Sequence, residues 1–417
     1  MQQDSGYGPL PRRRGSGSWL THTIVGVLAA GLAVAVVLLF FTPTSGSSLP
    51  GSGAVPAPAP SDAPLASSQQ DIVNKVKPGL VLINTTLQYN SEVAAGTGMV
   101  VNADGLVLTN NHVIEDSTKI TATVTSTGKT YPARVVGYDQ TGDVALIQLQ
   151  NASGLTTVPI GNSSSVKAGE AVVAMGNAEG QGHITATPGH VTALNQTITA
   201  SDEAGSTTSE TLYGTIQTNA DIVPGDSGGP LASTAGVIGM DTAGNDSGDQ
   251  QGPAAGFAIP INAALSVARQ IAVGHASSVI TVGYPPFLGV FVGAGSSSDP
   301  RTQAQQQEQQ QNGGSDGSGS TQECYSSNAD LTIPSVIAPV RSGTLIDGTI
   351  CGSPAASARL TGGAVITAVN GQAVGSPDDF ARIMTRFHPG DTISVTWVSP
   401  SGQRTTSSLH LTAGPPQ

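Results

Sequence analysis

A serine stands among glycines and a carboxylate in the stretch GDSGGPL, Gly225–Leu231. Adjacent glycines cost backbone entropy, so the chain must turn tightly here or admit a close neighbour. A serine hydroxyl becomes a nucleophile when a general base accepts its proton and a third group orients that base. It also needs backbone N–H groups that face the oxygen that becomes negative. The stretch therefore predicts that Ser227 is a nucleophile; the simpler alternative is a serine in an ordinary turn.

The order of residues along the chain separates two enzyme classes that use a G-x-S-x-G pattern. The α/β-hydrolases place the acid and then the histidine after the serine. Here LTNNHVI, with His112, and QTGDVALIQL, with Asp143, precede Ser227, and each puts its polar residue at the edge of an apolar segment. The order His112, Asp143, Ser227 is that of chymotrypsin-type β-barrel proteases. The alternatives are a structural histidine, a turn-capping aspartate with Asp139 as the acid, and an esterase.

Short β-branched segments separated by turn signals must position these residues. GTGMVVNADGLVLTNNHVI and ITATVTSTGKTYPARVVGYD are two examples, and ADG and STGK within them are hairpin signals. Many short strands with close turns predict a mainly β domain, either a barrel or a sandwich. A short helix is expected near residue 70, and a second over 262–274 with Asn262 as its cap.

The segment Thr23–Phe41 carries no charge and follows Arg12, Arg13 and Arg14. A bilayer core needs about 20 apolar residues in a helix, and cationic flanks favour the cytoplasmic side. We therefore expect one transmembrane helix, with the rest of the chain outside the cytoplasm. A cleaved signal peptide is the main alternative, and a buried core helix is disfavoured because the segment has no polar face.

Two further stretches have compositions that suit linkers. Residues 42–68 are rich in Pro, Ser, Gly and Ala, which predicts an extended tether. Residues 294–322 are dominated by Gln, Gly and Ser, and we expect them to be a disordered insertion. A short helix in the Gln run is the alternative, although the composition offers nothing to fix it in place. The segments between residue 323 and the C-terminus alternate between strand and helix signals, including a helix capped by Ser376. These segments predict a second, smaller α+β domain.

Charge and cysteine content exclude some functions. The net charge is −12, which argues against a nucleic-acid partner. No His, Cys, Asp and Glu cluster has the spacing of metal ligands, and the sequence indicates no metal and no cofactor. Cys324 and Cys351 both lie on the outer side of the expected membrane span, where a disulfide is permitted and two free thiols are the alternative.

Several motifs together carry a specific resemblance. GTGMVVNADGLVLTNNHVI, VVGYDQTGDVALIQL, GNAEGQGHITATPGHVTAL, NADIVPGDSGGPL and GFAIPI resemble the HtrA/DegP-like family of serine proteases. The second unit resembles the PDZ domain that follows in that family, through FLGV and GSPAASARLTGGAVITAVNG. The resemblance implies a chymotrypsin-like double β-barrel, then a small α+β PDZ domain. The expected parts are a tail (1–22), a transmembrane helix (23–41), a linker (42–68), a protease domain (69–275) and a PDZ-like domain (276–412) with its insertion at 294–322.

The resemblance implies a role for each matching residue. His112 acts as general base and then general acid, Asp143 orients it, and Ser227 attacks the peptide carbonyl. The turn formed by Gly225, Asp226 and Ser227 supplies the oxyanion hole through the N–H groups of Gly225 and Ser227. The family more often has Asn where this chain has Asp226.

The specificity pocket is expected around Asp221 and Ile222. Asp221 stands six residues before the serine, as does the pocket-bottom acid of trypsin-like proteases. One hypothesis is therefore cleavage after basic side chains. The alternative is a solvated acid in a loop, with the small aliphatic preference of the family retained.

The second unit is expected to bind a peptide C-terminus by strand addition. The resemblance places the carboxylate loop at Phe287, Leu288, Gly289 and Val290; the alternative is a domain that only packs against the protease. It also implies unfolded polypeptide substrates, work in protein quality control without ATP, and a homotrimer. The competing function is that of a latent chaperone or scaffold.

Overall fold

The computed structural model describes residues 65–89, 92–201, 209–244, 255–293, 296–310, 324–327 and 331–416. The predicted tail, transmembrane helix and most of the linker, at 1–22, 23–41 and 42–64, lie outside the described residues. Among the helices that are described, none combines the length and the apolar character that crossing a membrane requires.

The first ring of strands carries the histidine and the acid. Strand β5 pairs with both β4 and β6, so the order β5-β4-β1-β2-β3-β6 closes on itself. Alternating burial along β4 and β5 fits strands with one face toward a core. The strands of this ring are β1 (Leu80–Leu87), β2 (Glu92–Asn102), β3 (Leu106–Thr109), β4 (Lys119–Val124), β5 (Thr130–Asp139) and β6 (Val144–Leu149).

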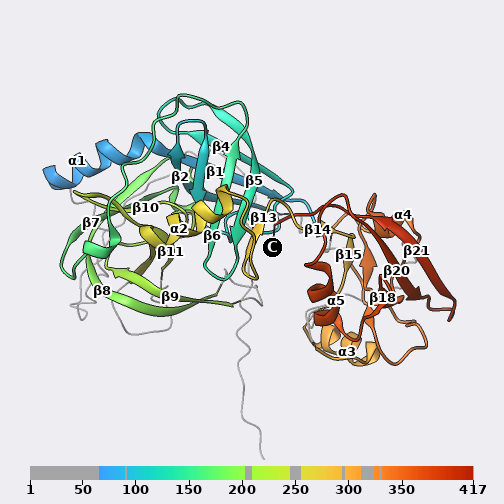
Figure 1. Cartoon of the computed structure of the whole chain (residues 1–417). Coiled ribbons are helices and arrows are strands. Elements are labelled where there is room, and N and C mark those ends of the chain that lie inside the picture. Colours follow the sequence, from blue (N-terminus) through green and yellow to red (C-terminus); the bar gives the residue numbers. More distant parts are fainter. Residues whose placement is uncertain are drawn as a thin grey trace, which may run out of the picture. The chain divides into compact units, whose positions relative to one another are not determined.

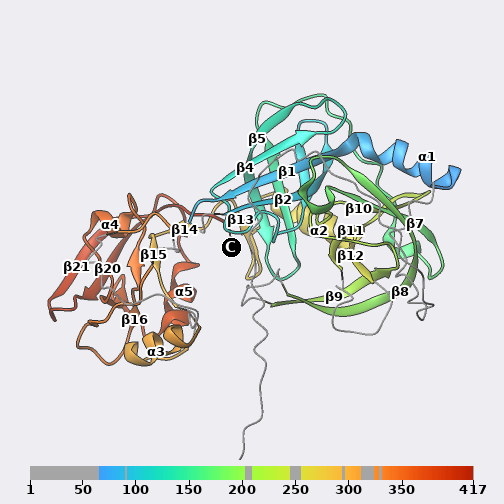
Figure 2. The ribbon, with the colours of Figure 1, turned by 180° about the vertical axis from the view of Figure 1, so that it is seen from behind.

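The second ring carries the nucleophile turn and is a closed barrel in the order β10-β11-β12-β9-β8-β7. Its strands are β7 (Ala171–Gly176), β8 (Thr185–Ser201), β9 (Ser209–Thr218), β10 (Pro230–Ser233), β11 (Gly236–Gly244) and β12 (Gly256–Pro260). The mainly β chymotrypsin-like fold expected from the sequence is therefore present. Figure 1 and the reverse view in Figure 2 show the two groups of strands with their connecting segments.

Two helices pack against the strands of the rings and contribute to their shared core. The helix α1 (Ser67–Val76) and the single turn η1 (Lys77–Gly79) lead into β1, as expected. The helix α2 (Ile261–Ala272) follows β12 and buries residues at helical spacing, including Ile261, Ala264 and Ile271. Its N-cap is Pro260, so the prediction that Asn262 caps it is wrong. The Asn262 side chain instead donates to Asn162 Oδ1 and Ser164 Oγ, beside the turn η2 (Ser163–Ser165).

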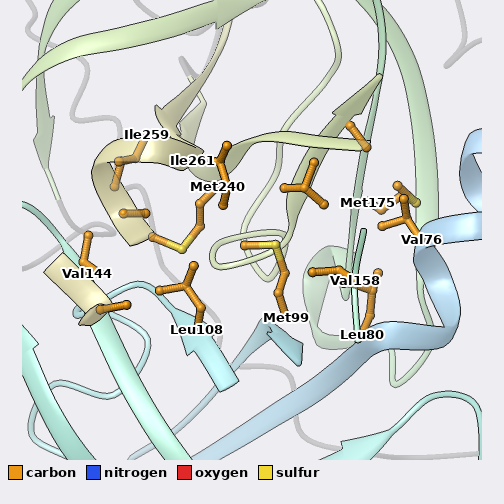
Figure 3. Packing of buried hydrophobic residues seen from close by; sticks show 14 of the residues in the cluster. Val76, Leu80, Met99, Leu108, Val144, Val158, Met175, Met240, Ile259 and Ile261 are labelled. Atoms are coloured by element: carbon orange, nitrogen blue, oxygen red, sulfur yellow. The ribbon is translucent and has the colours of Figure 1, made fainter. Parts of the chain in front are cut away.

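The main core lies between the rings, directly behind the site. Figure 3 shows Met99, from β2, and Met240, from β11, among these side chains. The labelled members from both rings, the adjoining helices and one loop are Val76, Leu80, Met99, Leu108, Val144, Val158, Met175, Met240, Ile259 and Ile261. Because Met240 precedes Asp241 and Thr242, this packing fixes the strand that backs the nucleophile turn.

The first unit extends further along the chain than expected. Strand β13 (Ile280–Val282) pairs with β5, and Ile280 belongs to the main core. The Val135 N–H donates to the Tyr284 hydroxyl at 3.2 Å. The predicted boundary at residue 275 is therefore too early, because a short strand after α2 adds to the first ring.

The C-terminal part, residues 286–416, has its own core around Ile346, Phe380 and Trp397. Its main sheet has the order β16-β18-β20-β21, while β19 pairs with β18, β15 with β17, and β14 with β22. The Ser376 hydroxyl accepts from the Asp379 N–H and caps α5, as predicted. The elements are β14 (Pro286–Phe287), β15 (Val290–Phe291), α3 (Pro300–Gln310), β16 (Thr344–Leu345), β17 (Gly348–Thr349), α4 (Pro354–Ser357), β18 (Val365–Val369), β19 (Gln372–Ala373), α5 (Pro377–Met384), β20 (Thr392–Val398), β21 (Arg404–His410) and β22 (Thr412–Ala413).

The expectation of disorder throughout residues 294–322 is wrong for α3. Gln303 and Ala304 are buried at 4% and 6% exposure. The Gln303 side chain accepts from the Leu345 N–H at 2.8 Å and donates to the Gly343 carbonyl at 2.7 Å. These hydrogen bonds between a side-chain amide and the backbone hold α3 in place, although its composition offers little apolar surface.

Candidate active site

Asp143 and His112 form a hydrogen-bonded pair in the first ring. Nδ1 of His112 lies 3.0 Å from Oδ2 and 3.1 Å from Oδ1 of Asp143, and the His112 backbone N–H donates to Oδ1 at 3.1 Å. Asp143 is 1% exposed, whereas the His112 side chain is 24% exposed. A buried acid thus orients an imidazole whose outer edge reaches solvent.

The turn before β6 selects Asp143 over its competitor Asp139. Asp143 has a φ of +50°, and the Asn110 side chain donates to its carbonyl at 3.0 Å. The Asp139 carboxylate instead accepts from the Gly142 N–H at 3.0 Å within its own turn. Asp139 therefore caps the turn that presents Asp143 to His112.

Thr242 connects Asp143 to Ser227, and sequence reasoning missed it. Its hydroxyl donates to Oδ2 of Asp143, and its carbonyl accepts from the Ser227 hydroxyl at 3.4 Å. The β11–β12 register shifts between Asp241 and Ala243, which places Thr242 in a bulge. A bulge re-aims a side chain at a strand edge. The only sequence signal for Thr242 was its place in the polar pair, Asp241 and Thr242, that follows the apolar run GVIGM.

The glycines around Ser227 are there for steric reasons. Gly225 has a φ of +91° and Gly228 a φ of +81°, a region that favours glycine. A Cβ on Gly228 would lie 2.2 Å from the Thr97 carbonyl oxygen, and one on Gly225 would lie 2.2 Å from the Asn177 carbonyl oxygen. Neighbouring backbone therefore leaves no room for a side chain at either of these two glycine positions.

Two N–H groups in this turn are available for a developing oxyanion. The Pro224 carbonyl accepts from the Glu179 N–H at 2.6 Å, and in a trans peptide the Gly225 N–H points the opposite way. Neither the Gly225 N–H nor the Ser227 N–H has an acceptor among the described residues. The Asp226 N–H donates to Val223 O at 3.0 Å, so this residue, included in the expected oxyanion turn, offers no free N–H.

Glu179 belongs to the short turn η3 (Ala178–Gly180) and has a φ of +53°. This turn therefore sets the direction of the peptide between Pro224 and Gly225.

Comparisons with known proteins show which family this chain resembles. A trypsin-like peptidase domain family matches residues 96–240. Serine protease PepD of Mycobacterium tuberculosis is 31% identical, over 93% of this chain and 78% of the relative.

The chain belongs to the HtrA/DegP-like family of serine proteases.

Other members of this family match over shorter stretches. The periplasmic pH-dependent serine endoprotease DegQ of Escherichia coli is 34% identical, over 54% of this chain and 51% of the relative. The solved HtrA-type protease AlgW with a decapeptide is 25% identical, covering 84% of this chain and all (100%) of that one, with a TM-score of 0.43. The chain thus spans most of PepD but about half of DegQ, and it is a serine peptidase.

The segment before the nucleophile places Asp221 and Ile222 differently. Asp221 is exposed, whereas Ile222 is buried at 6%. Ile222 Cδ1 is so close to Gly256 that a Cβ there would lie 2.6 Å away. An apolar side chain, and not the carboxylate, is therefore packed inside the second ring at this point.

Ser227 does not stand at a strand-to-helix elbow. It lies in a turn that leads into the strand β10. This position contradicts the esterase alternative, which requires a helix directly after the nucleophile.

The expected carboxylate loop lies at the start of the C-terminal part. Gly289 has a φ of +76°, and a Cβ there would lie 2.1 Å from Ser353 Cβ. The Leu288 carbonyl accepts from the Ala355 N–H, and Val290 pairs with Thr349. The N–H groups of Leu288 and Gly289 have no acceptor in the part of the chain that the structure describes. Phe287 is half-buried in β14.

Cys324 and Cys351 are joined in a disulfide. Beside it, Tyr325 donates to the Thr349 carbonyl and accepts from the Cys351 N–H, so the segment after the insertion is held against β17. No group of three or more potential metal-binding side chains occurs in the described ranges.

Proposed function

We propose that this protease is a membrane-anchored endopeptidase that cleaves unfolded or damaged proteins outside the cytoplasm through an acyl-enzyme. The observation that carries the catalytic part is the position of Thr242, which is hydrogen-bonded to both Asp143 and Ser227. Together with the bond from Asp143 to His112, it supports the proposal that His112, Asp143 and Ser227 act as one catalytic group.

The reaction follows from these contacts. Ser227 Oγ attacks the peptide carbonyl carbon while His112 accepts the hydroxyl proton at Nε2, because Asp143 occupies Nδ1. The N–H groups of Gly225 and Ser227 hold the negative oxygen, and one such donor contributes about 10²–10³ to kcat. His112 then gives the proton to the leaving amine as the C–N bond breaks. Water, deprotonated by the same imidazole, hydrolyses the ester on Ser227.

Covalent labelling tests this proposal and separates it from the latent chaperone. A fluorescent serine-directed phosphonate should label the full chain and the control Ser126→Ala, which changes an exposed loop serine, but not Ser227→Ala. Casein cleavage should follow the same pattern. A folded wild type that stays unlabelled under all conditions while it suppresses aggregation of an unfolded client would favour the chaperone.

The side chain before the cleaved bond is proposed to be small and aliphatic. Ile222 is buried against Gly256, while Asp221 remains exposed. A pocket that ends on an aliphatic side chain leaves a lysine or arginine head without a partner. Reporter peptides with Val, Ala, Lys or Arg at this position test the idea, and faster cleavage after Lys or Arg would assign the pocket to Asp221.

The membrane anchor is proposed from residues 23–41 and the preceding arginines. Their length and lack of charge suit a single span with the protease outside the cytoplasm. Carbonate extraction of membranes should leave the full chain in the pellet. Release into the supernatant, with an N-terminus beyond residue 41, would indicate the cleaved signal peptide.

The C-terminal part is proposed to be a PDZ domain that binds polypeptide C-termini. The free N–H groups of Leu288 and Gly289 suit a carboxylate, and β15 offers an edge for strand addition. A peptide ending in a free apolar carboxyl should bind, and the same peptide amidated should not. Equal failure of both peptides would favour a domain that only packs against the protease.

The trimer expected from the family predicts three times the chain mass in light scattering.

A further inference from the structure

Two carboxyl groups lie buried behind the nucleophile turn. Asp226 is 3% exposed and Asp241, on β11, is 0% exposed. Oδ1 of Asp226 and both carboxyl oxygens of Asp241 have no hydrogen-bond partner of good geometry among the described residues. A buried carboxylate without a donor is strongly disfavoured. We therefore expect at least one of these carboxyl groups to be protonated.

Backbone hydrogen bonds bring the two residues together across the glycines that follow Ser227. The Gly229 N–H donates to the Asp226 carbonyl and the Asp241 N–H to the Gly229 carbonyl, each at 2.8 Å. The Gly228 N–H donates to the Asp241 carbonyl at 2.9 Å. Since Thr242 comes next in the chain, a displacement of Asp241 moves the residue that is bonded to both Ser227 and the catalytic acid.

The surroundings favour the protonated forms. Burial raises the pKa of Asp226 to about 6, the Val223 N–H lowers it, and the Asp221 carboxylate raises it further. Burial raises the pKa of Asp241 well above its ordinary value, the Asp226 carboxyl raises it again, and the Met175 N–H lowers it. Interacting carboxyls of this kind lose their protons as a pair.

Few other charges act on this pair. The neighbouring strands β7, β10 and β12 contain no ionisable side chain. Other ionisable groups near the turn, among the described residues, are Asp221 in the preceding loop, the exposed Glu179 of η3 and, beyond Thr242, the bonded pair of Asp143 and His112. No cation near the carboxyls is therefore on hand to replace the proton.

We propose that Asp226 and Asp241 share one proton, and that this carboxyl–carboxylate bond positions the Ser227 turn for reaction. Asp241 is then a positioning residue, because it acts through Asp226 and Thr242. The inference rests on the proposed catalytic role of Ser227. It goes beyond that role because it makes the reactive turn depend on a buried proton.

The pH dependence follows from the sign of the shifts. Both groups hold a proton more tightly in the folded turn than in an unfolded chain, so their contribution to stability is greatest at low pH. It falls as the pH rises above the ordinary carboxyl pKa and is lost once the pH passes the folded pKa values, of which that of Asp226 is about 6. Above that range two like charges remain in a buried site, and their repulsion separates β11 from the turn.

The experiment measures the rate of phosphonate labelling of the full chain between pH 5.5 and 9.5. Wild type should label faster as the general base loses its proton and then at least about tenfold more slowly at the alkaline end. Asp241→Asn supplies an amide donor to Asp226 at every pH, so its rate should stay high there. Asp104→Asn, which changes an exposed acid, is the control and should follow wild type.

Circular dichroism at each pH verifies that the barrels remain folded. The same alkaline decline in Asp241→Asn, or its absence from folded wild type, overturns the proposal. If Asp241→Asn does not fold, Asp226→Asn offers the same donor from the other side. If neither folds, the infrared spectrum of Asp347→Asn decides, because this variant removes the other buried carboxyl whose pKa is raised, and a protonated carboxyl band must still disappear as the pH rises above 6. That band also separates failure of this inference from failure of the catalytic proposal, since it does not require labelling.

Discussion

Replacing Thr242 with valine removes one hydroxyl and keeps the shape of the side chain. Thr242 is 6% exposed, and its hydroxyl donates to an acid that is 1% exposed. A hydrogen bond to a charged group contributes about 1.5–3 kcal/mol. Asp143 keeps its bonds to His112 at 3.0 and 3.1 Å, so the bottom of that range should apply. We expect Thr242→Val to lower kcat about tenfold, the equivalent of about 1.4 kcal/mol.

The assay is steady-state hydrolysis of a reporter peptide together with the rate of phosphonate labelling. Thr242→Ser retains the hydroxyl and should recover most of the activity, while thermal melting shows how much of the loss comes from stability. Thr242→Val within about twofold of wild type in kcat/KM would refute the reasoning. A serine variant as impaired as the valine variant would also refute it, because the missing methyl group and not the hydroxyl would then be responsible.

Three further predictions concern other parts of the structure. Gly228→Ala places a methyl group 2.2 Å from a backbone carbonyl at a φ of +81° and should abolish casein cleavage, whereas Gly128→Ala, at +67° in open space, should not; similar activities would contradict the steric argument. Asp139→Asn should keep most of the activity because Asp139 caps a turn. Asp143→Asn should lose about 10⁴ in kcat, as in the serine–histidine–aspartate template, and the reverse order would exchange the two roles. Burial raises the pKa of Asp347 to about 7, so the stability of the C-terminal part should fall as the pH rises toward and through that value. Calorimetry between pH 5 and 8 should show a flatter decline for Asp347→Asn, and equal slopes would argue against this.

Local sequence patterns predicted an element well where contacts between neighbouring residues are enough to form it. Alternating burial in β4 and β5 and the hairpin signals between strands depend on neighbouring residues. The cap at Ser376 is equally local, since its hydroxyl accepts from a backbone N–H three residues away. The Asn262 cap failed because loop residues about 100 positions earlier bind that side chain. What holds the helix α3 could not be predicted for the same reason, since the Gln303 side chain bonds to backbone about 40 positions away.

The sequence by itself determined which chemistry is available: a serine between glycines, with a histidine and acids ahead of it in chain order. It also determined the alternation of apolar and polar residues that forms strands. Both the available chemistry and this alternation depend only on residue types and short spacings. Only the tertiary structure decided that Asp143 faces the histidine while Asp139 caps a turn, and that Thr242, 99 positions after Asp143, connects that acid to Ser227. Only folding buries Asp226 and Asp241 behind the same turn, with Oδ1 of Asp226 and both carboxyl oxygens of Asp241 left without a well-aligned partner among the described residues. The physical reason is that hydrogen bonding and desolvation depend on which distant segments pack against each other, and spacing along the chain does not specify that packing.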